Sequence, residues 1–266
     1  MTSAIPTRTQ AERADQTRAR ILDAAVLEFS ANGLAGARTE HIAEAAGVNK
    51  ALLYYYFNNK QALYDAALES VANRVVTTSM AAMGVEGSAG ERLLRSALNH
   101  FDRIHSQRAF QSLMQQEMIR LHRGEENAIA PLVDKVFRPL LARMRQVYAE
   151  GRDAGELIEV DEMQMLYAAL GANVFYFLSA PMMKMLMDTD PFDRAAIEFR
   201  RRSAIEYLGS TIFVDREQGA RVAARVLAST PMPEPAENAA SRFSMSKFGN
   251  QKIAIDVTKT NEVRRT

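Results

Sequence analysis

The chain has 266 residues, 47% of them hydrophobic, so it can bury the core of one large or two modest domains. The absence of cysteine excludes disulfides, thiol catalysis and cysteine-ligated metal. A formal net charge of +1 argues against a non-specific nucleic-acid coat and favours a localised basic patch. No run of 18 apolar residues occurs and the N-terminus has no hydrophobic signal core, so we expect a cytoplasmic protein.

Apolar residues recur at helical spacing along nearly the whole chain. A flexible arm over 1–14 precedes a first helix over 15–32, which Asn32-Gly33 should end. The same periodicity predicts later helices at 61–83, 91–106, 108–123, 127–154, 161–187, 191–213 and 217–228. No strong strand pattern or internal repeat appears. We therefore predict an all-α fold, with a three-helix head at 15–62 and a larger helical body at 63–228.

The segment 38–57, together with Lys60, predicts two short helices joined by a turn. Thr39 can cap the first helix, because its hydroxyl can accept from a backbone N–H that has no intrahelical partner. Gly47 follows where the chain must leave that helix, since glycine adopts a left-handed conformation without steric penalty. The apolar face of the first helix and the turn is formed by Ile42, Ala43, Ala46 and Val48.

The second short helix carries apolar anchors on one side and polar groups on the others. Leu53 and Phe57 are four residues apart and point the same way. The remaining sides carry Lys50, Ala51, Leu52, Tyr54, Tyr55 and Tyr56. Such a helix suits the DNA major groove, which admits one α-helix, because phenol and ammonium groups can donate to phosphates on either wall. This spacing predicts a helix-turn-helix.

The predicted DNA contacts extend along both short helices and the start of the next. His41 and Lys60 are placed to reach phosphates. The full set is Arg38, Thr39, Glu40, His41, Lys50, Ala51, Leu52, Tyr54, Tyr55, Tyr56 and Lys60.

The pattern resembles the DNA-binding domain of the tetracycline-repressor (TetR) family. Its residues here are Thr39, Ile42-Ala43, Ala46-Gly47-Val48, Leu53-Tyr54, Phe57, Lys60 and Leu63, with Ile21-Leu22, Ala24-Ala25, Phe29 and Gly33 upstream. The resemblance covers about residues 15 to 70 and implies a dimeric, ligand-responsive regulator, most often a repressor. It also implies pairing through the last two long helices of the body, here 161–187 and 191–213.

Two positions depart from many relatives. Leu52 stands where a small residue is common, so apolar contact with a thymine methyl would replace a hydrogen bond to a base. Glu40 stands where some relatives carry a basic residue; its carboxylate would repel phosphate or accept from a cytosine amine. The operator therefore cannot be copied from a relative.

The body offers candidate walls for an effector site. Methionine packs adaptably and suits pockets for varied apolar ligands. We expect a small apolar or aromatic effector near Met114, Met118, Phe137, Met144, Phe175 and Tyr176. The alternative is that these side chains are ordinary core or dimer interface, because 161–187 also carries small residues suited to close helix approach. The sequence does not divide this helix between pocket and interface.

The starts of two predicted body helices show capping signals. Asp161 with Gln164 has capping-box spacing, and Asp190 precedes Pro191 at a predicted helix start. Beyond them, residues 229–266 begin with proline-rich sequence and end with scattered basic residues. They predict a disordered tail, with weak salt-sensitive DNA binding as the alternative.

Catalytic chemistry finds little support. The histidines His41, His100, His105 and His122 show no paired metal spacing, and we expect surface or capping positions for them. We predict no metal, no cofactor and no enzymatic activity. Two alternatives to a ligand-responsive regulator remain: an architectural DNA binder without effector control, recognisable by poor sequence discrimination, and an enzyme or lipid carrier, recognisable by turnover.

Overall fold

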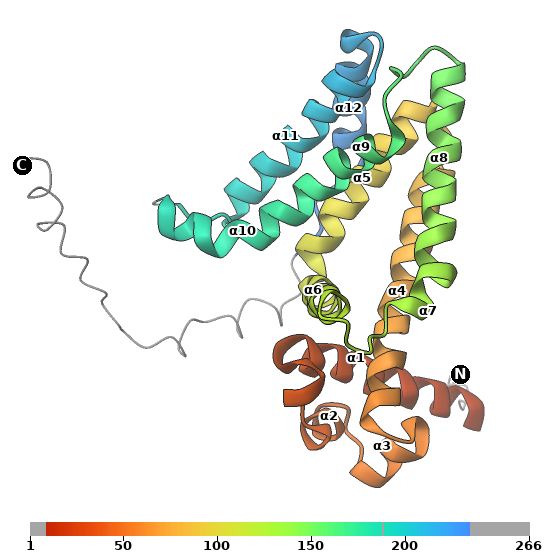
Figure 1. The fold of residues 1–266 in the computed structure, drawn as a ribbon, viewed down its shortest axis with the longest axis vertical. Helices are drawn as coiled ribbons and strands as arrows, with labels where there is room; N and C mark the ends of the chain where they lie inside the picture. Colours follow the sequence, from red (N-terminus) through yellow and green to blue (C-terminus); the bar gives the residue numbers. More distant parts are fainter. Residues whose placement is uncertain (1–8, 188, 235–266) are drawn as a thin grey trace, which may run out of the picture. The chain divides into compact units, whose positions relative to one another are not determined.

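The computed structural model describes residues 9–187 and 189–234, which pack as one compact unit (Figure 1). Within these ranges the chain folds into helices and contains no β-strand. An isolated antiparallel bridge joins Leu157 and Phe213. The prediction of an all-α protein with an N-terminal helix-turn-helix head and a larger helical body is confirmed.

The head begins earlier than predicted. Its helices are α1 (Gln10–Gly36), α2 (Thr39–Ala45) and α3 (Lys50–Phe57). Thr9 and Glu12 form a capping box, which starts α1 within the stretch predicted to be a flexible arm; residues 1–8 of that arm lie outside the described part. Gly33 has a φ of 67°, so it kinks α1 instead of ending it.

Helix α4 (Lys60–Gly84) runs from the head into the body. Its first half joins α1, α2 and α3 in a cluster of buried apolar side chains, which we call the head core. The head core includes Ile21, Phe29, Ile42, Leu53, Leu68 and Ala72, together with Leu113, Leu132 and Val136 from the body. The proposed boundary between residues 62 and 63 is therefore crossed by continuous packing.

The body surrounds α5, which packs against α4, α8, α10, α11 and α12. Its elements are α5 (Ala89–Ser106), α6 (Arg108–His122), α7 (Ala130–Leu132), α8 (Arg138–Asp153), α9 (Glu162–Leu166), α10 (Ala172–Leu186), α11 (Arg194–Ile212) and α12 (Arg216–Ser229). Two π-helical turns, η1 (Val133–Phe137) and η2 (Tyr167–Gly171), connect α7 to α8 and α9 to α10. The predicted helices at 127–154 and 161–187 are thus continuous, each with one wider turn.

Two further apolar clusters fill the body. The cluster that we call the body core includes Met83, Leu94, Leu98, Met144, Tyr148, Leu208, Phe213 and Val226. A smaller one, between α5, α10 and α11, contains Phe101, Ile104, Phe177 and Ile197. α11 and α12 approach each other closely at Gly209 and Gly219. A Cβ on Gly219 would lie 1.9 Å from the carbonyl oxygen of Gly209, so only glycine fits there.

One predicted cap is correct and another is wrong. The Asp161 carboxylate accepts from the Gln164 N–H at 2.9 Å and starts α9. Asp190, by contrast, accepts from the Phe192 N–H at 2.9 Å within a turn, and α11 starts only at Arg194. Pro191 therefore lies in the turn and not at a first helical position.

The described end of the chain lies against the body. The Arg201 guanidinium donates to the Thr230 carbonyl at 2.9 Å, and Met232 packs on the small cluster around Phe101. Residues 230–234 are thus held in place, whereas 235–266, most of the proposed basic tail, lie outside the described residues.

Candidate nucleic-acid interface

Helix α3 is held by its two apolar anchors. Leu53 and Phe57 are buried in the head core, as their spacing predicted. The Asn49 side chain caps the helix by accepting from the Leu52 N–H at 2.7 Å. Asn49 was missed as a functional residue, although an asparagine before an apolar-periodic segment is a helix-start signal. The turn before it passes through Gly47, whose φ is 65°.

The outward face of α3 is narrower than predicted. Lys50, Ala51, Leu52 and Tyr55 are exposed, with Tyr55 the most open at 82%. Tyr54 and Tyr56 are half-buried and pack against the head core. Neighbouring elements cover the flanks of the helix that carry these two tyrosines, so Tyr55 is the tyrosine of α3 that is open to solvent, and the DNA contacts of Tyr54 and Tyr56 stay predictions.

Thr39 has a different role from the predicted cap. Arg38 is the N-cap residue of α2 and makes no side-chain capping hydrogen bond. Thr39 is buried, and its hydroxyl lies 3.1 Å from the Tyr54 hydroxyl, where either can donate. Both hydroxyls are thereby engaged within the head, and the pair links α2 to α3.

Glu40 and Lys50 form an ion pair between the two short helices. The Lys50 ammonium lies over the Tyr54 ring, 5.8 Å from its centroid. The hydrogen bond from Lys50 lowers the pKa of the Glu40 carboxyl, and the same bond to Glu40 raises the pKa of Lys50. Both groups therefore stay charged at neutral pH, and the carboxylate offsets the positive charge of this surface.

Three further predicted contacts surround α3. The Arg38 side chain is exposed, and its backbone N–H donates to the Glu28 carboxylate at 3.0 Å. His41 Nδ1 lies 3.6 Å from the same carboxylate. Lys60 Nζ donates to the Ala35 carbonyl at 3.0 Å. No local spacing signals Glu28, because it belongs to α1, ten residues before Arg38.

The predicted effector residues do not converge on one cavity. Met114 and Phe137 pack against the head core, and Met144 belongs to the body core. Tyr176 packs on the small cluster around Phe101 and donates to the Pro191 carbonyl at 2.5 Å. Met118 and Phe175 are exposed.

The histidines also differ from expectation. His105 is buried, and the Nδ1 atom of His100 is inaccessible to solvent, so neither is a surface or capping residue. His41 and His122 are exposed, as predicted.

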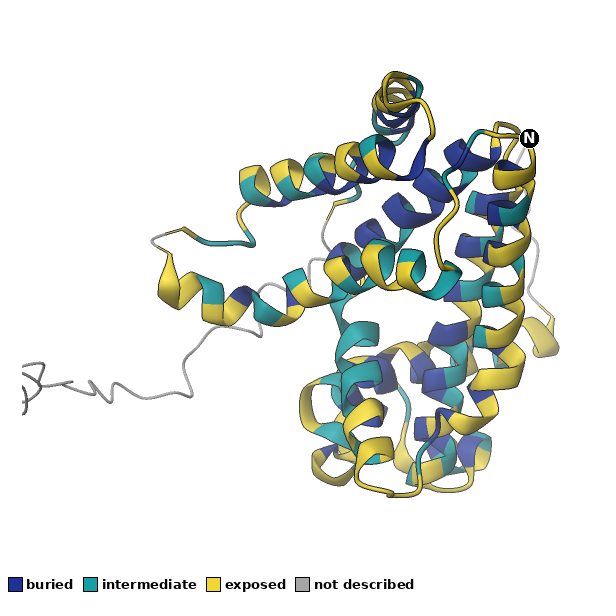
Figure 2. Cartoon of the chain, turned by 45° about the horizontal axis from the view of Figure 1, so that its top comes forward, coloured by how far each residue is buried: buried dark blue, intermediate teal, exposed yellow. Residues whose placement is uncertain are grey.

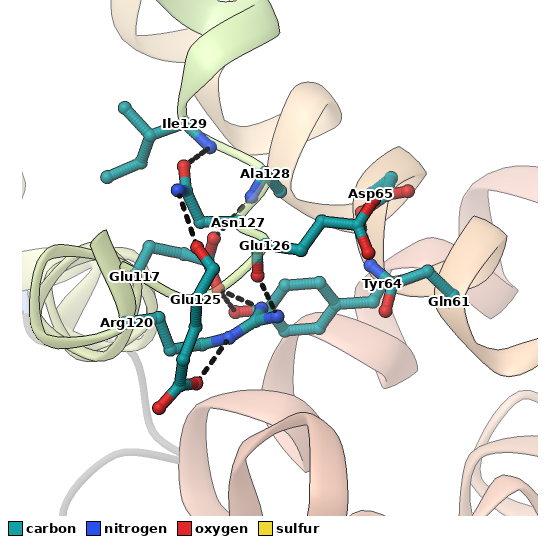
Figure 3. Close-up of polar contacts among 10 residues, drawn as sticks. All are labelled: Gln61, Tyr64, Asp65, Glu117, Arg120, Glu125, Glu126, Asn127, Ala128 and Ile129. Atoms are coloured by element: carbon teal, nitrogen blue, oxygen red, sulfur yellow. Dashed lines mark hydrogen bonds and ion pairs between the residues drawn. The ribbon is translucent and has the colours of Figure 1, made fainter. Parts of the chain in front are cut away.

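A buried carboxylate connects the head to the body (Figure 3). Glu117 on α6 accepts from the Tyr64 hydroxyl on α4 at 2.8 Å, from Arg120 at 2.7 Å and from the Ala128 N–H at 2.5 Å. Nearby, the Ser112 hydroxyl donates to the Ser30 carbonyl of α1 at 2.8 Å. Hydrogen bonds as well as apolar packing therefore tie α6 to the helices that carry α3.

Known proteins share both parts of this architecture. Residues 21–67 match the family model of bacterial regulatory proteins of the tetR family, and residues 91–208 match the tetracyclin repressor-like C-terminal domain. The transcriptional repressor NicS of Pseudomonas putida is 44% identical over 62 residues, covering 23% of this chain and 29% of NicS. The regulator RutR of Escherichia coli is 53% identical over 51 residues, covering 19% of this chain and 24% of RutR.

Similarity in three dimensions extends over the body. A putative transcriptional regulator from Saccharomonospora viridis, in complex with choline, has a TM-score of 0.60 at 17% identity. The match covers 77% of this chain and 100% of that one, and it supports the fold alone.

The head, its exposed α3 and the helical body define a helix-turn-helix transcriptional regulator. The two matched models together span more than half of the sequence, and the chain belongs to the TetR family.

Proposed function

We propose that this protein is a ligand-responsive repressor that binds a near-palindromic operator as a dimer and is released by a small effector. The observation that carries the proposal is the presentation of α3: two buried anchors hold it while Lys50, Leu52 and Tyr55 face outward. A single short helix buries too little surface for useful affinity, so two heads over successive major grooves are required.

The proposed dimer surface lies on the helix from Glu162 to Leu186 and on α11. The helix from Glu162 to Leu186 is long and apolar enough to cross a membrane. Its most apolar window has a mean hydropathy of 1.3, yet only 17% of that window is buried. Figure 2 shows mostly exposed and half-buried residues along α10. The exposed large apolar side chains are Tyr167, Phe175, Leu178, Met182, Met185, Leu186, Phe199 and Tyr207. A second copy of the chain is the occupant that suits this surface, because a two-fold axis would cover it on both copies and pair the two heads.

Phe175 is accordingly assigned to the dimer surface and not to an effector wall. The regulator of similar fold from Saccharomonospora viridis is in complex with choline, and we propose control by a small molecule for this chain as well. An effector would release DNA by favouring a head spacing that does not fit two half-sites, and it can do so only through different affinity for the two states.

Two experiments test this function. Selection of bound fragments from a random DNA library should return an inverted repeat; fragments without a shared sequence would favour the architectural alternative. Light scattering should give a dimer mass at micromolar concentration, and a monomer both free and on DNA would contradict the proposal. We also propose a cytoplasmic location. We propose no catalytic activity, which turnover assays on the purified protein would test.

A further inference from the structure

A polar layer separates the head core from the body core along α4. Residues of α4 up to Ala72 belong to the head core, and Met83 belongs to the body core. Ser79 lies between them and is buried. Its neighbours one turn away on the same face, Val75 and Met83, are buried and apolar. The hydroxyl of Ser79 is therefore a polar group set in an apolar stripe.

Arg103 of α5 points at this hydroxyl. Arg103 is only 9% exposed, and its Nη1 donates to Ser79 Oγ at 3.0 Å. The Nε atom is buried and has no hydrogen-bond partner within residues 9–187 and 189–234. Across the same ranges, no carboxylate lies within ion-pair distance of this guanidinium. Asn99, one turn before Arg103, places its amide nitrogen 3.5 Å from Ser79 Oγ.

His100 adds a second uncompensated group. Its Nδ1 is buried without a partner in the described chain. Burial, and secondly the charge of Arg103, lowers the pKa of His100 to about 3, while burial lowers the pKa of Arg103 to about 10. His100 is therefore neutral at pH 7 and Arg103 is charged, so the layer holds one positive charge, and the described residues place no counter-charge beside it.

Helix α5 also supplies the carboxylate that pairs with another buried arginine. Arg201 of α11 donates two hydrogen bonds to Asp102, at 2.7 and 2.9 Å, and both residues are buried. A buried charge is normally paired in this way, because removing it from water without a partner is strongly unfavourable. Groups that depart from this rule are found most often at functional sites.

We propose that Arg103, Asn99 and His100 bind an anionic head group of the effector, a carboxylate or phosphate carried on an apolar body. The planar guanidinium matches the geometry of either oxyanion, and the Asn99 amide and the single N–H of the neutral His100 imidazole can also donate to it. Val75 and Met83, which flank Ser79, are buried, so the apolar part of the ligand would have to displace side chains packed beside them. This inference rests on the proposed control by an effector, and it replaces a purely apolar ligand with an amphipathic anion.

The position of the layer explains how such a ligand would act on DNA binding. It lies where α4 passes from the head core to the body core, so a ligand there contacts the helix that carries both. Occupancy would favour one arrangement of head and body over the other, provided that the two arrangements bind the anion with different affinity.

The test uses full-length protein without DNA and probes matched in apolar body. Decanoate, decyl phosphate and decanol would be compared by calorimetry and by thermal melting. We expect at least one of the two anions to bind at least ten-fold more tightly than decanol and to raise the melting temperature. The affinities of decanoate and decyl phosphate, compared with each other, then show whether a carboxylate or a phosphate is preferred. Equal affinity for decanol and both anions, or no binding by any probe, would overturn the proposal.

The variant Arg103→Gln keeps a donor for Ser79 but removes the charge. It should bind decanol as the natural protein does and lose the preference for the anion. Retention of that preference would place the anion elsewhere and overturn the assignment of Arg103.

Stability without ligand supplies an independent readout. Arg103→Met removes an uncompensated charge and should leave the melting temperature unchanged or higher, because sites built for a ligand are commonly held at the expense of stability. The matched control Arg201→Met strands Asp102 and should lower it by at least about 5 °C. An equal fall in both variants would show that Arg103 only supports the fold, and would overturn the proposal.

Addition of operator DNA separates this site from the proposed function. If decanoate or decyl phosphate binds through Arg103 and releases the operator, both proposals hold. Binding through Arg103 without release would retain the anion site and contradict effector control through it.

Discussion

The phenol of Tyr64 donates a 2.8 Å hydrogen bond to the fully buried carboxylate of Glu117, and this contact joins α4 to α6. Burial, and then the hydrogen bond to Glu117, raises the pKa of Tyr64, so the phenol remains the donor at every physiological pH. With Arg120 and the Ala128 N–H as further donors, the carboxylate is satisfied without water.

Tyr64→Phe should destabilise the protein. The substitution removes one hydrogen bond to a buried charge, which contributes about 1.5–3 kcal/mol. For a chain of this size we expect a melting temperature lower by roughly 3–10 °C. The control is Tyr55→Phe, which removes an exposed hydroxyl and should change stability by less than about 0.5 kcal/mol. Equal melting of the two variants would mean that the Tyr64 bond contributes nothing net.

The sequence predicted those parts of the head that depend on local periodicity. Leu53 and Phe57 share one face of a helix whatever the rest of the chain does, and both are buried. Tyr54 and Tyr56 lie on the flanks, and whether a flank is covered depends on how α2 and the head core pack against α3. The burial of these flanks therefore depends on long-range packing, which cannot be predicted from the spacing of residues within an eight-residue helix.

Where the effector candidates lie depends on long-range packing for the same reason. Phe175 and Phe177 are the same residue type and lie two positions apart in the sequence. Around a helix, however, they are separated by about 200°. Phe177 is buried and Phe175 is exposed, because α5 covers only one side of α10. The polar layer at Arg103 was not visible in sequence, since an arginine in an amphipathic helix is usually solvated. Only the positions of α4 and α5 reveal that no carboxylate of the described residues pairs with Arg103.

The faces of α3 can be checked by three substitutions. Phe57→Ala empties a core position and should cost about 3–5 kcal/mol of unfolding free energy. Lys50→Ala and Tyr55→Ala should leave melting unchanged and weaken operator binding, because both side chains face outward. Unfolding of the head by Lys50→Ala, with unchanged melting of Phe57→Ala, would show that the facing is inverted.

Glu40→Gln should strengthen DNA binding. The Glu40 carboxylate pairs with Lys50 in the free protein and would face phosphate in the complex. Removal of that charge frees the ammonium for a phosphate, so the slope of log K against log salt should steepen by about one released counterion. Glu44→Gln, on the same short helix, is the control for loss of an exposed carboxylate. Weaker binding by Glu40→Gln at low salt would instead indicate that Glu40 accepts a hydrogen bond from a base.

Acid should destabilise the protein through His100. Its pKa is lowered to about 3 in the folded state, so between that value and the ordinary value near 6.5 the unfolded chain binds a proton that the folded chain does not. This contribution is absent above pH 6.5 and lowers stability as pH falls, by up to about 1.4 kcal/mol per pH unit. Urea unfolding of the natural protein and of His100→Gln from pH 4.5 to 7.5 measures it. Parallel curves would show that His100 titrates alike in both states.

Phe175→Glu should separate the proposed dimer. Phe175 is 63% exposed in the single chain and lies in the first turn of α10, on the proposed dimer surface. A carboxylate there would be taken out of water against the apolar side chains of the partner, which is strongly unfavourable, whereas in the monomer it would remain in water. We expect the mass from light scattering to fall to that of one chain and operator affinity to drop with it, while the helical content is unchanged. Met118→Glu is the matched control, because Met118 is 58% exposed but lies on α6, away from that surface. A dimer that survives Phe175→Glu but dissociates with Met118→Glu would show that the interface involves α6, and it would contradict the proposed interface on α10 and α11.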